Sequence, residues 1–272
     1  MTLTDTHCHL YFDAYDKDRD AVLARAWEAG VERILVPGID LASSRTALEL
    51  ADASPQVYAA VGVHPNSALT WDAHTLDALI QLAAHPKVVA IGEIGLDYYR
   101  DRAPCGIQKR VLRDQVSLAG RVNLPIIIHT RNSSPEDQAC FADIIEIIHE
   151  MRAELSEDRP GVFHSFLESE AEAQGALEQG FYIGITGPVT FNNAHELRRV
   201  VASTPVEKLL IETDGPFLTP HPHRGKRNEP AHVYYVAEKI AQVLGLSPRA
   251  LAEATTANAG RLFQWRVSDF EQ

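Results

Sequence analysis

The stretch Pro125-Ile126-Ile127-Ile128-His129 decides the fold class, because a run of branched apolar residues ends abruptly at a polar one. A strand without polar alternation is typical of a parallel sheet whose two faces are both buried. Similar short runs, rich in valine and isoleucine, recur along the chain with amphipathic segments between them. The pattern therefore predicts alternating strands and helices.

We predict eight strands, at Leu3–His9, Arg33–Pro37, Val57–Val63, Val88–Glu93, Pro125–His129, Gly161–Phe166, Phe181–Thr186 and Lys208–Asp214. Helical segments are predicted at Asp16–Ala29 and Thr75–Ala84, and a last helix begins at Ser247-Pro248. Strand–helix alternation repeated about eight times predicts a (β/α)8 TIM barrel. Such a barrel takes about 250 residues, so we expect residues 1–272 to form a single domain.

Composition and charge narrow the class of protein. Hydrophobic residues make up 45% of the chain, which is enough for a large core. Three cysteines cannot form a disulfide framework, and the N-terminus lacks the pattern of a secretion signal. No apolar stretch is long enough to span a membrane. We therefore expect a cytoplasmic protein, with a monomer as the default state.

The net charge of −12 disfavours a broad, non-specific grip on nucleic acid, which usually needs a basic surface. A nucleic acid substrate would have to be held locally, by metal ions and a small basic patch. One such patch is His223-Arg224-Gly225-Lys226-Arg227, in a proline-rich loop. A run this short is more often a solvated loop than a binding site.

Metal-competent side chains stand at the carboxyl ends of five predicted strands. They are His7, His9, Glu93, His129, His164 and Asp214. In a (β/α)8 barrel these strand ends meet at the face that carries the active site. The pattern predicts that four imidazoles and two carboxylates gather there.

The spacing of His7 and His9 supports shared ligation. Residues two apart in a strand project from the same face, whereas Cys8 points the other way. Asp5 and Glu212 each precede a proposed ligand by two residues. Each of these carboxylates would either orient a ligating group or be a buried charge satisfied by hydrogen bonds.

With two carboxylates available, two cations become plausible, and one carboxylate could bridge them. Asp214 is placed to steer a water molecule and take its proton, so Asp214 and Glu93 are the predicted catalytic residues. Hydrolysis is favoured over redox chemistry because the sequence carries no dinucleotide-binding fingerprint. The ligand types leave Zn, Mn, Mg and Fe open.

Eight ordered motifs span nearly the whole chain. They are Asp5-Thr6-His7-Cys8-His9-Leu10, Gly62-Val63-His64-Pro65, Ala90-Ile91-Gly92-Glu93-Ile94-Gly95-Leu96-Asp97-Tyr98, Leu124-Pro125-Ile126-Ile127-Ile128-His129-Thr130-Arg131, Gly161-Val162-Phe163-His164-Ser165-Phe166, Glu212-Thr213-Asp214-Gly215-Pro216, Pro222–Pro230 and Asn258-Ala259-Gly260-Arg261-Leu262-Phe263. With these motifs the sequence resembles the TatD-type metal-dependent hydrolases, often described as TatD DNases.

The resemblance implies a TIM-barrel hydrolase with two divalent cations and phosphodiesterase activity, notably trimming of DNA from 3′ ends. It implies that one cation is held by His7, His9, Glu93 and Asp214. Glu93 would bridge to a second cation, held also by His129 and His164. His64 corresponds to a position associated with substrate phosphate, and Arg224 and Arg227 are further candidates for substrate binding.

The chain departs from the family pattern after His164. Ser165 replaces a usual cysteine, and Leu167-Glu168-Ser169 replaces a small, glycine-containing turn. A glycine there would let backbone N–H groups approach a phosphate, so this change concerns the substrate and not the metals.

Two other classes of function stay open. An ester or amide hydrolase, such as a D-aminoacyl-tRNA deacylase, would use the same ligands, although the fourth strand offers Glu93 and no bridging lysine. A non-catalytic nucleic-acid-associated protein would be expected to have lost ligands, and none is missing from the sequence. A phosphodiesterase or nuclease is the preferred function.

Overall fold

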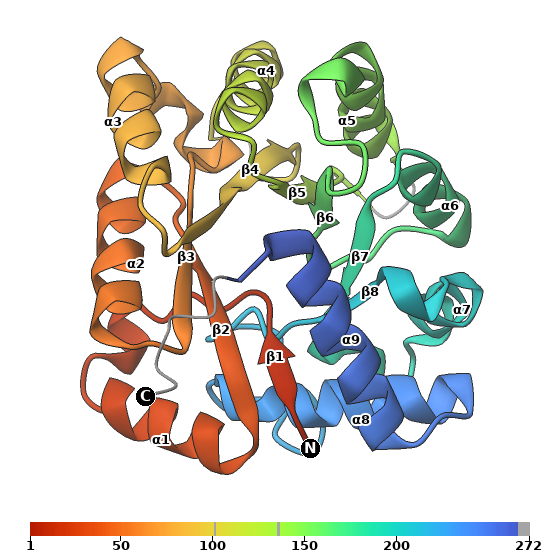
Figure 1. Ribbon diagram of the computed structural model, residues 1–272. Coiled ribbons are helices and arrows are strands. Elements are labelled where there is room, and N and C mark those ends of the chain that lie inside the picture. The colour runs from red at the N-terminus through yellow and green to blue at the C-terminus, as the bar shows by residue number, and fades with distance from the viewer. Residues whose placement is uncertain (101, 135–136, 266–272) are drawn as a thin grey trace. The chain divides into compact units, whose positions relative to one another are not determined.

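The structure is a computed structural model that describes residues 1–100, 102–134 and 137–265. Its strands are β1 (Leu3–Asp5), β2 (Val31–Pro37), β3 (Val57–Val61), β4 (Val88–Asp97), β5 (Ile126–Arg131), β6 (Gly161–Phe163), β7 (Tyr182–Ile185) and β8 (Leu209–Ile211). The sheet order follows the chain from β1 to β8 (Figure 1), and the strand pairs are parallel. All eight predicted strands are present in the described residues, and the predicted (β/α)8 TIM-barrel class is confirmed.

Helices follow the strands in alternation. The α-helices are α1 (Arg19–Glu28), α2 (Leu41–Ala53), α3 (Ala73–Ala83), α4 (Cys105–Val122), α5 (Ala139–Glu150), α6 (Glu170–Glu178), α7 (His195–Ser203), α8 (Val233–Leu244) and α9 (Pro248–Phe263). Short 3₁₀ helices lie at Asp13–Tyr15, Pro65–Thr70, Arg152–Glu154, Gly187–Thr190, Val206–Lys208 and Pro230–His232. Among the described residues, no helix is both long and apolar enough to cross a membrane.

Five predicted strands end earlier in the structure than the apolar pattern indicated. β3 stops at Val61 and β7 at Ile185, only slightly early. β1 stops at Asp5, β6 at Phe163 and β8 at Ile211. Ser165 and Asp214 have left-handed backbones, with φ of 44° and 54°, and a residue in that region cannot continue a strand. The metal-competent side chains of these segments therefore lie on the turns just beyond the strands.

Two predicted boundaries shift for other reasons. Helix α3 begins at Ala73 because the Asp72 side chain accepts a hydrogen bond from the backbone N–H of Thr75. β4 continues beyond Glu93 to Asp97, where a buried glutamine holds it. The side-chain Oε1 of Gln108 accepts from the N–H of Asp97, and its Nε2 donates to the Asp97 carbonyl.

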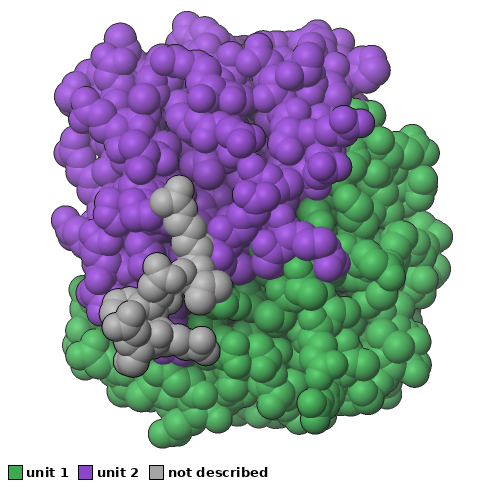
Figure 2. Space-filling model, viewed as in Figure 1, with its two compact units in different colours: residues 1–36, 162–259 green, residues 37–161, 260–272 purple. Residues whose placement is uncertain are grey.

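The chain divides into two compact units, which Figure 2 shows in different colours. Unit 1 comprises residues 1–36 and 162–259, and unit 2 comprises residues 37–161 and 260–272. The single-domain assignment for residues 1–272 stays a prediction.

Unit 1 contains β1, β2, β6, β7 and β8. The segment after β1 is tied to the segment after β8 by a parallel bridge between Cys8 and Gly215. The backbone N–H of Asp214 also donates to the carbonyl of His7, at 2.8 Å. The segments that follow the first and the last strand therefore lie side by side.

Unit 2 contains β3, β4 and β5, with α2 packed on β3 and α4 packed on β4. The segment after β3 is held by a buried amide. Gln115 Oε1 accepts from the Val63 N–H at 2.7 Å, and Gln115 Nε2 donates to the Val63 carbonyl at 2.9 Å. Because His64 is the next residue, these two hydrogen bonds also fix the backbone from which the imidazole of His64 projects.

Candidate metal centre

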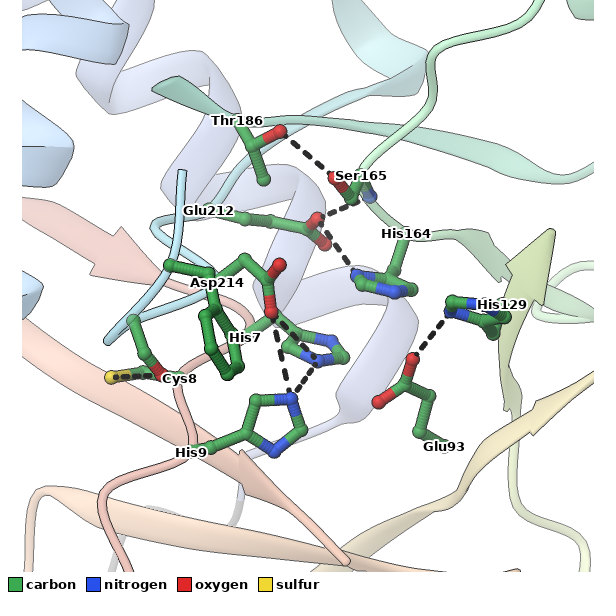
Figure 3. Close-up of polar contacts among 12 residues, drawn as sticks. His7, Cys8, His9, Glu93, His129, His164, Ser165, Thr186, Glu212 and Asp214 are labelled. Atoms are coloured by element: carbon green, nitrogen blue, oxygen red, sulfur yellow. Dashed lines mark hydrogen bonds and ion pairs between the residues drawn. The ribbon is translucent and has the colours of Figure 1, made fainter. Parts of the chain in front are cut away.

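Three metal-competent side chains of unit 1 point toward one another (Figure 3). His7 Nε2 lies 3.2 Å from His9 Nε2, and Asp214 Oδ1 lies 3.8 Å and 3.5 Å from these two atoms. One ligand atom from each residue falls within 4.8 Å of the others. Two imidazole nitrogens and one carboxylate oxygen are ligands suited to Zn, Mn or Fe. The residues present therefore fit a divalent cation.

The carboxylate of this cluster is ionised. Burial alone would raise the pKa of Asp214, but the hydrogen bond with His9 and the nearby imidazoles lower it below its usual range. An ionised carboxylate is the form that binds a cation or accepts a proton. Asp214 is thus in the protonation state that both of its predicted roles require.

Cys8 lies between the two histidines in the sequence but faces away from them. Its Sγ is 3.9 Å from the hydroxyl of Tyr15 and 3.7 Å from the carbonyl of Gly215. Burial raises the pKa of the thiol well above its usual value. Cys8 is therefore a packing residue, as its spacing from His7 and His9 predicted, although it lies beyond the end of β1.

Asp5 supports the cluster through the backbone. Its carboxylate accepts hydrogen bonds from the N–H of His7, and from the N–H and the hydroxyl of Thr213. Burial raises the pKa of Asp5 to about 8. Of the two interpretations open for Asp5, the structure favours a buried acid satisfied by hydrogen bonds, one that joins the segments bearing His7 and Asp214.

His164 extends the unit 1 cluster. Its ring stacks on that of His7, with centroids 3.9 Å apart and planes 13° apart. Glu212 Oε2 lies 3.8 Å from His164 Nδ1 and accepts from the N–H of Ser165 at 2.9 Å. The Ser165 hydroxyl in turn lies 3.0 Å from that of Thr186 (Figure 3). The carboxylate of Glu212 thus has hydrogen-bond donors in Thr6 and Ser165, and its contact with His164 is longer than a hydrogen bond.

Gly184 leaves the space that Glu212 occupies. A Cβ atom at Gly184 would lie 2.4–2.5 Å from the carboxylate atoms of Glu212. Burial raises the pKa of Glu212 to about 7. The position of this buried acid thus depends on a glycine in the neighbouring strand.

Unit 2 carries a second cluster of metal-competent residues. Glu93 Oε1 lies 2.8 Å from His129 Nδ1 (Figure 3) and 3.5 Å from His64 Nε2. The rings of His64 and His129 meet edge-on, with centroids 4.3 Å apart. One ligand atom from each of the three falls within 4.8 Å of the others. This set also fits a divalent cation, and it includes His64, for which the sequence predicted a substrate contact.

Two residues beside this cluster, Asp97 and Asn66, are not among the site residues predicted from the sequence. Asp97 Oδ2 lies 3.5 Å from His129 Nε2 and accepts from Asn66 Nδ2 at 3.0 Å. The N–H of Asn66 donates to Nδ1 of His64. Asp97 could have been found, because Glu93, Gly95 and Asp97 share the two-residue period of a strand. We predicted that this strand ended at Glu93.

The predicted substrate-binding arginines differ in their surroundings. Both terminal nitrogens of Arg227 donate to the carboxylate of Asp18, at 2.7 Å. Arg224 is exposed, and its guanidinium lies over the ring of Phe191, 4.2 Å from the centroid. Arg224 therefore presents its donors to solvent, whereas Arg227 is engaged within unit 1.

Residues 4–264 match the protein family described as TatD related DNase. The chain belongs to the TatD family of metal-dependent hydrolases. This agrees with the motifs around both clusters and with the resemblance seen in the sequence.

Relatives of the TatD family align over nearly their whole length. The chain is 45% identical to the uncharacterized metal-dependent hydrolase YabD of Bacillus subtilis, covering 96% of this chain and 99% of the relative. It is 37% identical to the 3′-5′ ssDNA/RNA exonuclease TatD of Salmonella typhimurium, covering 96% and 98%. The crystal structure of YJJV, a TatD homolog from Escherichia coli, is 31% identical and superposes with a TM-score of 0.88 over 96% of this chain and 98% of that one.

Proposed function

We propose that this chain is a divalent-metal-dependent phosphodiesterase that removes nucleotides from the 3′ ends of nucleic acid. The observation that carries the proposal is the cluster of His7, His9 and Asp214, whose ligand atoms lie within 4.8 Å of one another. Membership of the TatD family and the name of the Salmonella relative support a nuclease. The Glu93 cluster would supply the ligands for a second cation.

When bound, divalent cations would neutralise charge on the phosphate and favour the ionisation of water. The residues of the chain would supply the rest. Asp214, ionised beside His9, would accept the proton of the attacking water. Glu212 would hold the imidazole of His164 in place through the contact at 3.8 Å. Arg224, exposed on the proline-rich loop, would donate to a phosphate oxygen.

The charge of the chain constrains how nucleic acid would be held. A formal net charge of −12 opposes binding through many phosphates along a duplex. An end of a strand, where one phosphodiester meets the cations and one or two cationic side chains, suits this chain better. This is why the proposal specifies an exonuclease.

A labelling experiment tests the proposal. Purified protein is stripped with a chelator, reloaded with Mg, Mn or Zn, and given single-stranded DNA that carries a label at either the 5′ or the 3′ end. We expect 5′-labelled DNA to shorten progressively and 3′-labelled DNA to release a labelled mononucleotide first. The same panel includes single-stranded RNA and D-aminoacyl-tRNA.

The outcomes separate the candidate activities. Release of amino acid from D-aminoacyl-tRNA, with DNA and RNA intact under every metal, would replace the nuclease by the ester hydrolase. Internal cuts with no preference for an end would show that the protein is a phosphodiesterase but not an exonuclease. Activity that survives the chelator would contradict metal dependence.

A further inference from the structure

Two phenylalanine side chains of unit 1 lie beside the His7–His9–Asp214 cluster. The ring of Phe12 stacks on the imidazole of His9, with centroids 5.0 Å apart and planes 22° apart. Phe217 meets Phe12 edge-on, with centroids 5.8 Å apart. Phe217 is 53% exposed, although most large apolar side chains of the described chain are buried. This exposed ring therefore lies where a ligand of the candidate metal cluster could contact it.

Each ring is attached to a candidate metal ligand by a tight turn. The N–H of Phe12 donates to the carbonyl of His9 at 3.1 Å, and the N–H of Phe217 donates to the carbonyl of Asp214 at 2.9 Å. The ligands themselves approach to 3.5 Å, between His9 Nε2 and Asp214 Oδ1. The two turns therefore bring the rings together at the same place where they bring the ligands together.

The turn that carries Phe217 is held firmly. The side-chain amide of the fully buried Asn228 donates to the carbonyls of Phe217 and Thr213, at 2.6 Å and 2.8 Å. Its backbone N–H donates to the carbonyl of Pro216. A ring whose backbone is fixed loses little conformational entropy on binding, so it suits a flat ligand.

We propose that the exposed ring of Phe217, braced edge-on by Phe12, forms a stacking platform for the nucleobase next to the scissile phosphodiester. This inference rests on the proposed function. A base that leaves its neighbours can stack on an aromatic side chain, and such stacking tolerates every base. The net charge of −12 limits what phosphate contacts can contribute, so contacts to the base would supply a larger share of the affinity.

The test compares two substrates and two variants. The substrates are single-stranded DNA with an ordinary 3′-terminal nucleotide and the same strand ending in an abasic tetrahydrofuran residue. The variants are Phe217→Ala and, as a matched control, Leu246→Ala, which shortens another exposed apolar residue of unit 1, just beyond α8. Phe217→Trp tests whether another aromatic ring restores the function.

For Phe217→Ala we expect KM on the ordinary strand to rise about tenfold with kcat little changed. On the abasic strand we expect KM to be high already in the unsubstituted protein and to be unaffected by the same substitution. Leu246→Ala should leave both substrates unchanged, and Phe217→Trp should restore a low KM on the ordinary strand.

Three outcomes would overturn the proposal. An equal loss on both substrates would mean that Phe217 supports the metal cluster and not the base. An unchanged KM of Phe217→Ala on both substrates would show that the ring does not contribute to substrate binding. Conversion of an oligomer to a monomer by Phe217→Ala, seen by sedimentation, would make the ring a protein interface. If the unsubstituted protein cleaves neither strand, the nuclease proposal fails, and this inference fails with it.

Discussion

The carboxylate of Asp97 lies 3.5 Å from Nε2 of His129, on the side of the imidazole opposite the nitrogen that contacts Glu93. Burial by itself would lower the pKa of His129, yet hydrogen bonds with Asp97 and Glu93 raise it to about 9. Burial would likewise raise the pKa of Asp97, but its bonds with His129 and other donors lower it below the usual range. Asp97 therefore orients His129 and selects which nitrogen faces Glu93.

Replacing Asp97 by asparagine should weaken metal binding. Without the negative charge, His129 loses its orienting partner, and such partners change metal affinity by about ten- to a hundredfold. Isothermal titration calorimetry measures this effect when Mn or Zn is added to protein that has been stripped of metal with a chelator. Asp114→Asn is the control, since Asp114 bonds to Trp71 away from the cluster. Equal affinities for the Asp97 variant and the unsubstituted protein would contradict the role of Asp97.

Asp214→Asn should abolish hydrolysis while the chain stays folded. The amide keeps the shape of the side chain but can neither accept a proton nor contribute charge to a cation beside His9. Single-turnover rates on end-labelled DNA and the circular dichroism spectrum are the two measurements. A variant with the spectrum of the unsubstituted protein and full activity would remove Asp214 from catalysis.

Gly184→Ala should destabilise the chain by displacing Glu212. The added methyl would lie 2.4–2.5 Å from the buried carboxylate, and overpacking of this kind costs about 1–3 kcal/mol. Gly106→Ala in α4 is the control, because no atom lies within 4 Å of its added Cβ. Urea unfolding followed by fluorescence compares the two. Similar midpoints for both variants would show that Glu212 moves without cost.

Arg224→Ala and Arg227→Ala should separate substrate binding from stability. Loss of the exposed Arg224 should raise KM on DNA by about tenfold, the size expected for one charge-assisted hydrogen bond. Loss of Arg227 should lower the unfolding midpoint, since it breaks both bonds to Asp18. A rise in KM for Arg227→Ala at unchanged stability would instead support the substrate contact predicted from the sequence.

His232 should make the chain less stable between pH 6.5 and pH 4. Burial, and then the charge of His223 stacked on it at 4.4 Å, lower the pKa of His232 to about 4. An unfolded histidine has a pKa of about 6.5, so in this range the unfolded chain takes up a proton that the folded chain does not. The contribution of His232 to the free energy of unfolding is therefore most favourable above pH 6.5 and falls as the pH drops toward 4.

Substitution His232→Gln removes this titration. The free energy of unfolding, measured in urea at half-unit steps from pH 4 to pH 7.5, should then fall less steeply on acidification than it does for the unsubstituted chain. Parallel curves for the two proteins would show that His232 is not the group responsible.

The fold could be predicted from the sequence because strands buried on both faces leave an unmistakable apolar run, as at Ile126–Ile128. The ends of the strands could not. The left-handed backbone of Ser165 ends β6 at Phe163 and not at Phe166. The side chain of Gln108 bonds to the backbone of Asp97 and so extends β4 beyond Glu93. The strand propensities of the residues do not reveal left-handed backbone conformations or hydrogen bonds from side chains elsewhere in the chain.

The candidate ligands were predictable for a related reason. Each predicted ligand stands at the polar end of an apolar run. Unit 1 brings together His7, His9 and Asp214, with His164, and unit 2 brings together Glu93 and His129. His64, which joins the unit 2 cluster, was predicted as a substrate contact and not as a ligand. The supporting residues were not predictable in this way. Asn66 acts through a backbone N–H and an amide, and Gly184 acts by lacking a side chain, so neither has a chemical signature in the sequence.

The hydrogen bonds from His7 and Thr213 to the single carboxylate of Asp5 connect the first strand of the chain to the last. A ribosome must therefore synthesise the chain as far as Asp214 before the candidate set of His7, His9 and Asp214 can close. Shortened chains that end before β8 retain His7 and His9 but lack the acid that completes the set. Any ion binding by this set would thus require a chain that extends past β8, and early fragments of the chain would lack it.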